Sequence, residues 1–469
     1  MHSLSQSKVF SEVKATLYLA IPLIAAQLAQ AATGFVDTVM MGLLGSETLA
    51  AGGLGAIIFF TVILISTGMV SSVGAIAATA HGAGELHRIS RLTIQGLWLT
   101  LALSLPMGFL IWNLSPLLLR FGQDPKAVAL AQTYLQALIW GFPAAVGFAV
   151  LRNILSALNY TRPIMAIVAS CVPLNIGGNY VLMFGKFGLP ALGLAGIGWS
   201  STLSFWVMFI AAASFLALSR RLKSYHIFRT SYQFDAREFL AIVKIGWPIA
   251  GLFAIETGLF AVTTFLMGTL GTVTLAAHNI ALQTANITFM VPVGLSLATT
   301  VRVGQAIGRQ DMSSAKRAGY VGIAIGVSFM SLTGLFLWTN PDKIVALYLD
   351  IQNPDNQPVL ESAISLLGIA AMFQIFDGMQ VVAAGALRGV KDTRIPMLIG
   401  FLGYWCIGLF SGYILGLRLN FGGVGLWLGL VLGLAFSGLL LTCRFAYLLT
   451  GKTDFIKKNS DIPPGNKQD

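Results

Sequence analysis

Long apolar runs dominate the chain and recur at short intervals from one end to the other. In hydrocarbon a backbone satisfies its N–H and C=O groups only as a helix or a closed barrel, and a spanning helix needs about 20 apolar residues. The pattern therefore predicts an all-α integral membrane protein with about twelve transmembrane helices. The predicted spans are residues 16–41, 52–72, 93–113, 129–150, 163–184, 192–218, 241–267, 275–299, 318–338, 361–386, 395–416 and 423–449.

One sequence pattern occurs twice, at residues 21–53 and again at residues 247–279. Because each half has an even number of spans, the two copies insert in the same orientation and are related by an axis along the membrane normal. We therefore predict two six-helix lobes related by a pseudo-twofold axis. When Pro22 is placed on Pro248, the coincident pairs are Met41/Met267, Gly42/Gly268, Gly45/Gly271, Thr48/Thr274 and Leu49/Leu275. The predicted divisions are 1–218 for the N-terminal lobe, 219–240 for a basic cytoplasmic linker, 241–450 for the C-terminal lobe and 451–469 for a polar cytoplasmic tail.

Composition agrees with this pattern, since 56% of the 469 residues are hydrophobic and only 10% are charged. The mean hydropathy of +0.79 leaves too little polar surface for a water-soluble globule, so the lipid bilayer is the expected solvent. The net charge of +11 is spread over the predicted loops of one side, which indicates topology and not a nucleic-acid surface.

Basic residues in short loops mark the cytoplasmic side of a membrane protein. With both termini placed inside, most Lys and Arg residues fall in cytoplasmic loops. The basic residues left outside are Arg120, Lys126, Lys186, Lys343 and Arg418. We therefore expect a multi-pass protein of a bacterial-type plasma (inner) membrane, with both termini cytoplasmic.

Asp37, Glu256 and Asp377 are the carboxylates that fall inside predicted spans and away from their ends. An ionised side chain at mid-bilayer costs at least about 2.5–3.5 kcal/mol on insertion scales, so it needs a function or a partner. We find no Lys or Arg in the interior of a predicted span, because the basic residues stand at span ends and in loops. The sequence therefore indicates a functional role for these three acids.

The acids have polar neighbours at helical spacing. Gln374, Asp377 and Gln380 are three residues apart and share one face of an otherwise apolar helix. Two further pairs of residues are candidates for a binding cavity: Asn175 and Asn179, which follow Pro173, and Gln283 and Asn286, which lie beside His278. The position of His278 near a helix start is typical of a structural hydrogen-bonding group.

The acids of the second half allow two kinds of ion chemistry. Together with amide or backbone oxygens, Glu256 and Asp377 could form a metal site for a hard monovalent cation such as Na⁺. Alternatively, their burial could make them carriers of H⁺. The chain contains no HExxH, GxSxG or GxxxxGK[ST] motif, so we predict neither an enzyme nor a bound cofactor. The ion that we expect to be coupled to transport is Na⁺ or H⁺.

Residues 10 to 450 resemble the multidrug and toxic compound extrusion (MATE) transporters, in the NorM-like branch. The residues that carry the resemblance are FVDTVMMG at 35–42, Glu256, LAAHNIALQ at 275–283, FMVPVGLSLATTVRVGQAIG at 289–308 and FDGMQVVAAGALRGVKDT at 376–393. The resemblance implies twelve helices in two lobes and exchange of inward Na⁺ or H⁺ for outward drugs. It also implies a cation site at Glu256 and Asp377, and a proton- or cation-responsive site at Asp37 with Asn175 and Asn179. The chain departs from the family pattern at Phe373, where NorM-like members carry a tyrosine.

We therefore expect an antiporter that exports drugs or other organic cations, acts as a monomer and works by rocking of its two lobes about a central cleft. A flippase for lipid-linked substrates, or an exporter of metabolites, is the alternative on the same architecture. A basic cavity would favour the flippase, whereas the predicted span interiors carry acids.

Overall fold

The computed structural model describes residues 2–120, 122–225 and 233–450, and the predicted tail 451–469 lies outside the described residues. The first half of the chain consists of helices joined by short turns and loops in its described part. Its helices are α1 (His2–Leu43), α2 (Ser46–Ala83), α3 (Leu86–Trp112), α4 (Ser115–Arg120), α5 (Pro125–Ile139), α6 (Phe142–Ala157), α7 (Thr161–Phe184) and α8 (Leu194–Leu218), followed by the 3₁₀ turn η1 (Arg220–Tyr225).

The second half repeats this plan with α9 as its first helix. Its elements are α9 (Ala236–Thr269), α10 (Thr272–Gly308), α11 (Met312–Thr339), α12 (Pro341–Val345), η2 (Pro354–Asn356), α13 (Gln357–Gly389), α14 (Arg394–Phe401), η3 (Leu402–Leu409), α15 (Phe410–Tyr413), η4 (Ile414–Arg418) and α16 (Gly422–Thr450). The elements α14, η3, α15 and η4 follow one another without a break and form a single span, residues 394–418.

The prediction of about twelve membrane helices is confirmed in the described part of the chain. Eleven helical segments are long and apolar enough to cross a bilayer, and α5 with α6 makes a twelfth that is bent by 48°. The bend lies where the sequence predicted one straight span. Gly141 stands at the break, and a Cβ there would lie 2.8 Å from Thr202 Oγ1 of α8, so only glycine admits this approach. The Thr202 hydroxyl also donates to the free carbonyl of Ala137 at the end of α5 (2.8 Å).

The span at 394–418 is also irregular, because η3 and η4 are π-helical. Its glycines face the glycines of α16 so closely that neither helix has room for a side chain at these positions. Small residues permit such backbone contact between membrane helices, and π turns are frequent at functional sites. The paired positions are Gly403 with Ser437, Gly408 with Gly433, Gly412 with Gly429 and Gly416 with Gly425.

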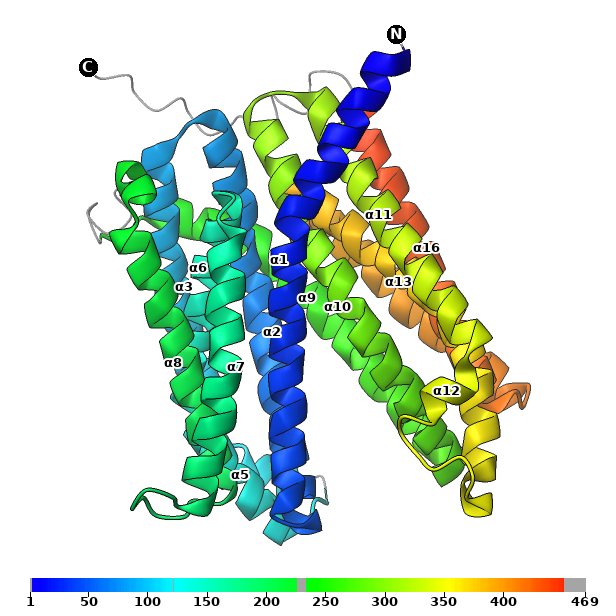
Figure 1. The fold of residues 1–469 in the computed structure, drawn as a ribbon. Helices are drawn as coiled ribbons and strands as arrows, with labels where there is room; N and C mark the ends of the chain where they lie inside the picture. The colour runs from blue at the N-terminus through cyan, green and yellow to red at the C-terminus, as the bar shows by residue number, and fades with distance from the viewer. Residues whose placement is uncertain (1, 121, 226–232, 451–469) are drawn as a thin grey trace.

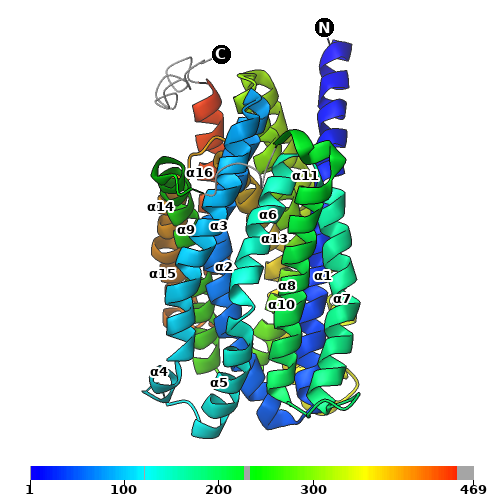
Figure 2. The ribbon, with the colours of Figure 1, turned by 90° about the vertical axis from the view of Figure 1, so that its left-hand side faces the viewer.

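The two halves form two lobes that meet at the end of the molecule where α1 begins and diverge toward the opposite end (Figure 1). Figure 2 views the molecule from the side of the N-terminal lobe, with α3, α6 and α8 toward the viewer. We call the first of these the basic end, because it holds the loops that the sequence analysis found rich in Lys and Arg. At this end Gly82 of α2 packs on the backbone of Gln305, and Gly308 of α10 packs on the backbone of Thr79. The two contacts are reciprocal, since each residue of one pair is the repeat counterpart of a residue of the other.

Equivalent turns in the two lobes have the same backbone geometry. Gly45 precedes α2 with φ 118° and ψ 167°, and Gly271 precedes α10 with φ 115° and ψ 167°. Such positive φ values favour glycine, which explains why both copies of the repeat keep it. The pseudo-twofold arrangement of two six-helix lobes is therefore present in the local geometry as well as in the sequence.

Substitution of Gly308 by Ala tests the contact between the lobes. The added Cβ has no room against Thr79, so we expect the two lobes to separate at the basic end. Spin labels on the exposed residues Ala83 and Gln310 would report a longer or broader distance distribution by double electron–electron resonance in nanodiscs. Gly53→Ala is the matched control, since nothing lies within 4 Å of a Cβ at Gly53. An unchanged distance in the Gly308 variant would contradict the prediction.

Candidate functional site

The first candidate site lies in the N-terminal lobe, where Asp37 of α1 joins a closed ring of hydrogen bonds. Asn179 Nδ2 donates to Asp37 Oδ1 (2.6 Å) and to Asn175 Oδ1 (3.2 Å). Asn175 Nδ2 donates to Ser201 Oγ (3.2 Å), and Ser201 Oγ donates to Asp37 Oδ2 (3.2 Å). Both carboxylate oxygens are thus held by donors from α7 and α8.

The local sequence explains how α7 presents two amides to one acid. Asn175 and Asn179 are four residues apart and therefore share a face of the helix, and both are fully buried. Ser200 Oγ of α8 donates to the backbone carbonyl of Asn175 (3.0 Å), which fixes the two helices in register. Ser201 was not predicted as a site residue, because serine hydroxyls in an apolar span give no signal until the facing helix is known.

One atom of this ring remains without a donor. Asn179 Oδ1 is buried and has no hydrogen-bond partner among the described residues. A buried acceptor left unpaired costs about 1–3 kcal/mol, so the site is incomplete as it stands. It has the capacity to accept one more donor or to face a cation.

The second candidate site lies in the C-terminal lobe and contains the other two acids. Glu256 of α9 is half-buried, Asp377 of α13 is 6% exposed, and the two carboxylates interact electrostatically. Neither of them forms an ion pair within the described part of the chain. Two acids that share one site repel each other when both are charged, so this site favours the uptake of a proton or a cation.

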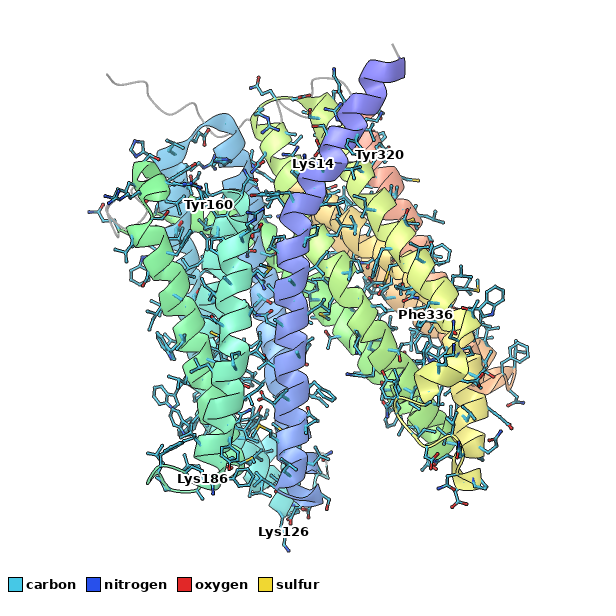
Figure 3. The ribbon with its side chains drawn as sticks, viewed as in Figure 1. Lys14, Lys126, Tyr160, Lys186, Tyr320 and Phe336 are labelled. Atoms are coloured by element: carbon cyan, nitrogen blue, oxygen red, sulfur yellow. The ribbon has the colours of Figure 1, made fainter. Side chains whose placement is uncertain are left out.

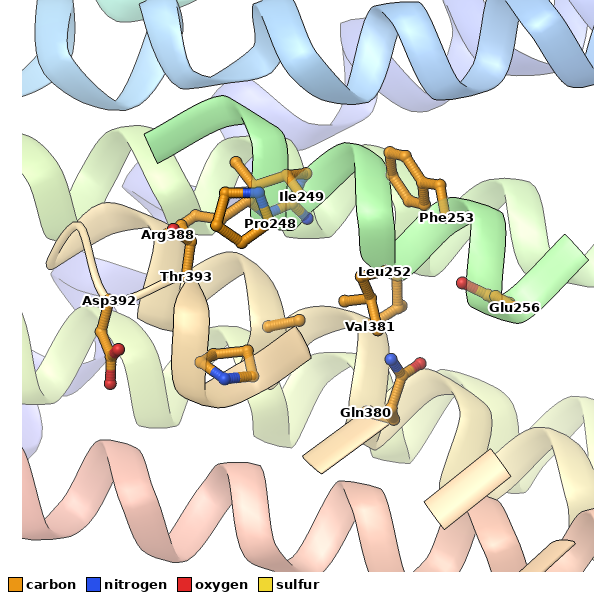
Figure 4. Close-up of a pocket in the computed structure, with 12 residues that line it drawn as sticks. Pro248, Ile249, Leu252, Phe253, Glu256, Gln380, Val381, Arg388, Asp392 and Thr393 are labelled. Atoms are coloured by element: carbon orange, nitrogen blue, oxygen red, sulfur yellow. The ribbon is translucent and has the colours of Figure 1, made fainter. Parts of the chain in front are cut away.

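A cavity between α9 and α13 extends from Glu256 toward the basic end. Figure 4 shows Glu256 at one end of it and Arg388, Asp392 and Thr393 at the other. Gln380 also lines the cavity, so one of the predicted polar residues of α13 does face the same space as Glu256.

Arg388 stands in the last turn of α13, at the end of its span as the sequence predicted, but its side chain is buried and only 8% exposed. Its Nη2 donates to Ser296 Oγ (2.8 Å), its Nε has no partner among the described residues, and its charge acts on Glu256. The predicted span ended at residue 386, whereas α13 continues for three more residues to Gly389.

Arg152 of α6 lies more than one turn inside its helix and departs from the expectation that no cation lies inside a span. Its Nη1 donates to Gln27 Oε1 (3.2 Å), while its Nε is buried with no partner in the described structure. Each lobe therefore places one arginine inside, near the basic end of a span.

The remaining predicted residues are divided between buried and exposed positions. Gln374 Oε1 accepts from Thr288 Oγ1 (2.9 Å), and Phe373 packs its ring against Trp427, with 5.3 Å between centroids. Gln283 and Asn286 of α10 are exposed. The structure thus brings Gln374 and Phe373 into the C-terminal lobe with Asp377, whereas Gln283 and Asn286 are not packed there.

His278 has both ring nitrogens occupied. Trp427 Nε1 donates to Nδ1 (3.2 Å), so the ring hydrogen is assigned to Nε2, which lies 3.0 Å from Thr264 Oγ1. Thr264 in turn donates to the carbonyl of Phe260 (2.9 Å). This geometry ties α9, α10 and α16 together and gives the histidine a structural role.

Ion pairs join the two lobes at the basic end. Arg88 of α3 donates to Glu238 of α9 (2.8 Å), and Arg302 of α10 donates to Glu12 of α1 (2.8 Å). Lys391 lies in the turn after α13. Burial and the nearby positive charge of Arg88 lower the pKa of Lys391 to about 8. The basic end thus combines close backbone packing with charge pairing between lobes.

A double-mutant cycle tests the bond between Asp37 and Asn179. A buried hydrogen bond to a charged group contributes about 1.5–3 kcal/mol, so we expect a coupling free energy of that size between Asp37→Asn and Asn179→Ala. Equilibrium unfolding in mixed micelles gives the free energies of the wild type, the two single variants and the double variant. Additivity within about 0.5 kcal/mol would show that the two side chains do not interact.

Lys391 offers a test of the electrostatics of the basic end. Because its pKa is lowered to about 8, the amine is half neutral near pH 8 and reactive above it. Competitive acylation, read by mass spectrometry, is expected to give half-maximal labelling of Lys391 near pH 8. Titration of Lys391 above pH 10 would contradict the described surroundings.

Comparison with known proteins identifies a family. The MatE family model matches residues 22–181 and 248–414, one block in each half of the chain. A relative from Synechocystis sp., a probable multidrug resistance protein NorM, is 41% identical over 442 residues, which cover 94% of this chain and 96% of that protein. The protein of the same description from Pseudomonas aeruginosa is 43% identical over 436 residues, covering 93% and 89%.

Solved structures agree on the fold. The crystal structure of the eukaryotic MATE transporter AtDTX14 has a TM-score of 0.85 at 19% identity, with 97% of this chain and 98% of that chain covered. A multidrug resistance MATE transporter described in an outward-facing conformation also has a TM-score of 0.85 at 19% identity, covering 94% and 96%.

Proposed function

This chain belongs to the MATE family of membrane transporters, and on that premise we propose that it exports organic cations in exchange for Na⁺ or H⁺. It is a multidrug efflux transporter of the NorM kind and not an enzyme. The observation that carries the coupling proposal is the presence of acids inside membrane helices of both lobes, the half-buried Asp37 in one and the half-buried Glu256 with the buried Asp377 in the other.

Each acid site suits the uptake of a positive charge. In the N-terminal lobe the carboxylate of Asp37 is already held by two donors, and the unpaired Asn179 Oδ1 beside it adds a further oxygen. In the C-terminal lobe two acids interact and neither forms an ion pair with a described residue, while the charge of Arg388 acts on Glu256. Phe253 lines the cavity of Glu256 and adds an aromatic ring there, which favours bulky organic cations.

The concentration gradient of the coupling ion supplies the driving force in this scheme. The membrane potential adds about 2.3 kcal/mol per 100 mV only for each net charge that moves inward, that is, when the entering ions carry more charge than the leaving substrate. Coupling of substrate export to ion entry requires that the ion binds from the outside at the site from which the substrate is released. We infer that rocking of the two lobes exposes the sites to the two sides in turn.

The arrangement of the lobes supports an outward-facing state with the basic end in the cytoplasm. The helices of the two lobes pack together at the basic end and diverge at the other (Figure 1). Lys126 and Lys186, which the sequence analysis assigned to the outside, lie at the end opposite Lys14 (Figure 3). Positive residues retained in the cytoplasm give this orientation, with the protein in a bacterial plasma membrane and each monomer carrying its own sites.

Transport driven by an imposed gradient tests the proposal. Ethidium efflux from proteoliposomes is measured under a Na⁺ gradient or a pH gradient for the wild type and for Asp37→Asn, Glu256→Gln and Asp377→Asn. We expect one gradient to drive efflux and each carboxamide to reduce the rate at least about tenfold, because an amide cannot exchange a charge. Glu361→Gln is the matched control, since Glu361 is an exposed acid on the same helix as Asp377.

The alternative of a lipid-linked flippase gives a different result. A flippase would move a lipid-linked anion without a cation gradient, and Arg388 and Arg152 would then be essential in place of the acids. Gradient-independent movement of such a lipid, with no efflux of any organic cation by folded protein, would refute the antiporter.

A further inference from the structure

Tyr404 is a buried phenol in the middle of the irregular span 394–418. Its side chain is 1% exposed, and its hydroxyl has no hydrogen-bond partner among the described residues. Leaving a buried hydroxyl unpaired costs about 1–3 kcal/mol. Neither the fold nor the candidate sites described above account for it.

The neighbours of Tyr404 fix its position along the axis of the adjacent helix α9. Trp405 Nε1, on the next residue, donates to the carbonyl of Ile255 (3.1 Å), which immediately precedes Glu256. The Trp405 ring lies against Gly258 on the same helix, where a Cβ would be 3.1 Å from Cζ2. The backbone at Tyr404 is therefore held at the level of Glu256.

Helix α16 fixes the position of Tyr404 relative to α13 in the same way. Ser437 packs against Gly403, the residue before Tyr404, and the next residue, Gly438, packs against the carbonyl of Phe376, where a Cβ would lie 3.3 Å from the oxygen. Phe376 immediately precedes Asp377. Residues adjacent to Tyr404 are thus joined, directly or through α16, to residues adjacent to both acids.

Tyr404 lies within electrostatic range of both acids. The charges of Glu256 and Asp377 act on it, and these two carboxylates also act on each other. Together with the contacts of its neighbours, this places the unpaired phenol of the π-helical turn η3 in the same part of the C-terminal lobe as the acids of α9 and α13.

The chemistry of the group is uniform. Beside the two carboxylates and the phenol, Gln380 Oε1 is buried without a donor in the described structure, and Gln380 lines the cavity of Glu256. Carboxylate, hydroxyl and amide oxygens are the ligands of hard cations, and softer ligands are absent from this set. Phe373, one turn before Asp377, has no side-chain oxygen to contribute to this set.

We propose that the Tyr404 hydroxyl is an oxygen ligand of a Na⁺ ion held between Glu256 and Asp377. This assignment rests on the proposed function, and it goes beyond it by choosing Na⁺ for this site and by adding a ligand from a third helix. Binding of the ion then ties the span 394–418 to α9 and α13, so that this span moves with the acids when the ion enters or leaves.

The test is direct binding of ²²Na⁺ to purified protein, measured by scintillation proximity together with the Na⁺-induced rise in Tm. Tyr404→Phe removes one oxygen and keeps the ring, and we expect it to weaken Na⁺ binding at least tenfold. Tyr413→Phe is the matched control, because Tyr413 is on the same span but 40% exposed beside Arg418. This control variant is expected to bind Na⁺ as the wild type does.

The outcomes separate this proposal from the proposed function. Unchanged Na⁺ affinity in Tyr404→Phe overturns the assignment of Tyr404, whatever the efflux assay shows. Absence of Na⁺ binding by the wild type, with efflux driven by a pH gradient and lost in Glu256→Gln, also overturns it and leaves an H⁺-coupled antiporter. If Tyr404→Phe does not fold, replacement of Tyr404 by 4-fluorophenylalanine keeps the size of the side chain; loss of Na⁺ binding supports the proposal and retention overturns it.

Discussion

The cost of an ionised group inside a bilayer is the constraint on which the functional reading of this protein depends. A carboxylate there persists only where polar groups or ions compensate it. Asp37 receives its compensation from Asn179 and Ser201, by hydrogen bonds that close a ring through Asn175. Glu256 and Asp377 receive no ion pair from the described residues, and the nearby charge of Arg388 is the compensation that the protein offers Glu256. The two lobes therefore treat their acids differently.

This difference stands on a scaffold that is closely symmetric. Gly45 and Gly271 begin equivalent helices with nearly the same dihedral angles, and Gly82 and Gly308 make reciprocal contacts between the lobes. The acids do not follow the repeat, since Glu256 falls opposite Gln30 in the first half. The two lobes therefore have similar helix packing but different acidic residues. This allows them to bind ions differently while they move as similar rigid bodies.

Close backbone contact gives this scaffold its rigidity. Without water, membrane helices associate through packing of small residues, and here glycines line both the contact between the lobes and the contact of the span 394–418 with α16. The same packing holds Tyr404 in a fixed place, because Gly403 rests on Ser437 and Trp405 on Gly258. A site that depends on several helices needs such fixed neighbours, since a ligand oxygen misplaced by about 1 Å loses most of its effect.

The sequence by itself determined the membrane class, the helix count and the duplication, because these follow from apolar length and from identities that need no partner. It also identified Asp37, Glu256 and Asp377, since an acid in an apolar run is visible without a fold. Only the tertiary structure decided which groups meet these acids. Ser201 and Tyr404 are ordinary residues of apolar spans until α8 and η3 are packed against their neighbours, and Arg388 lies beyond the apolar run of its helix. Contacts between helices far apart in the chain depend on packing, and hydrophobic length contains no information about packing.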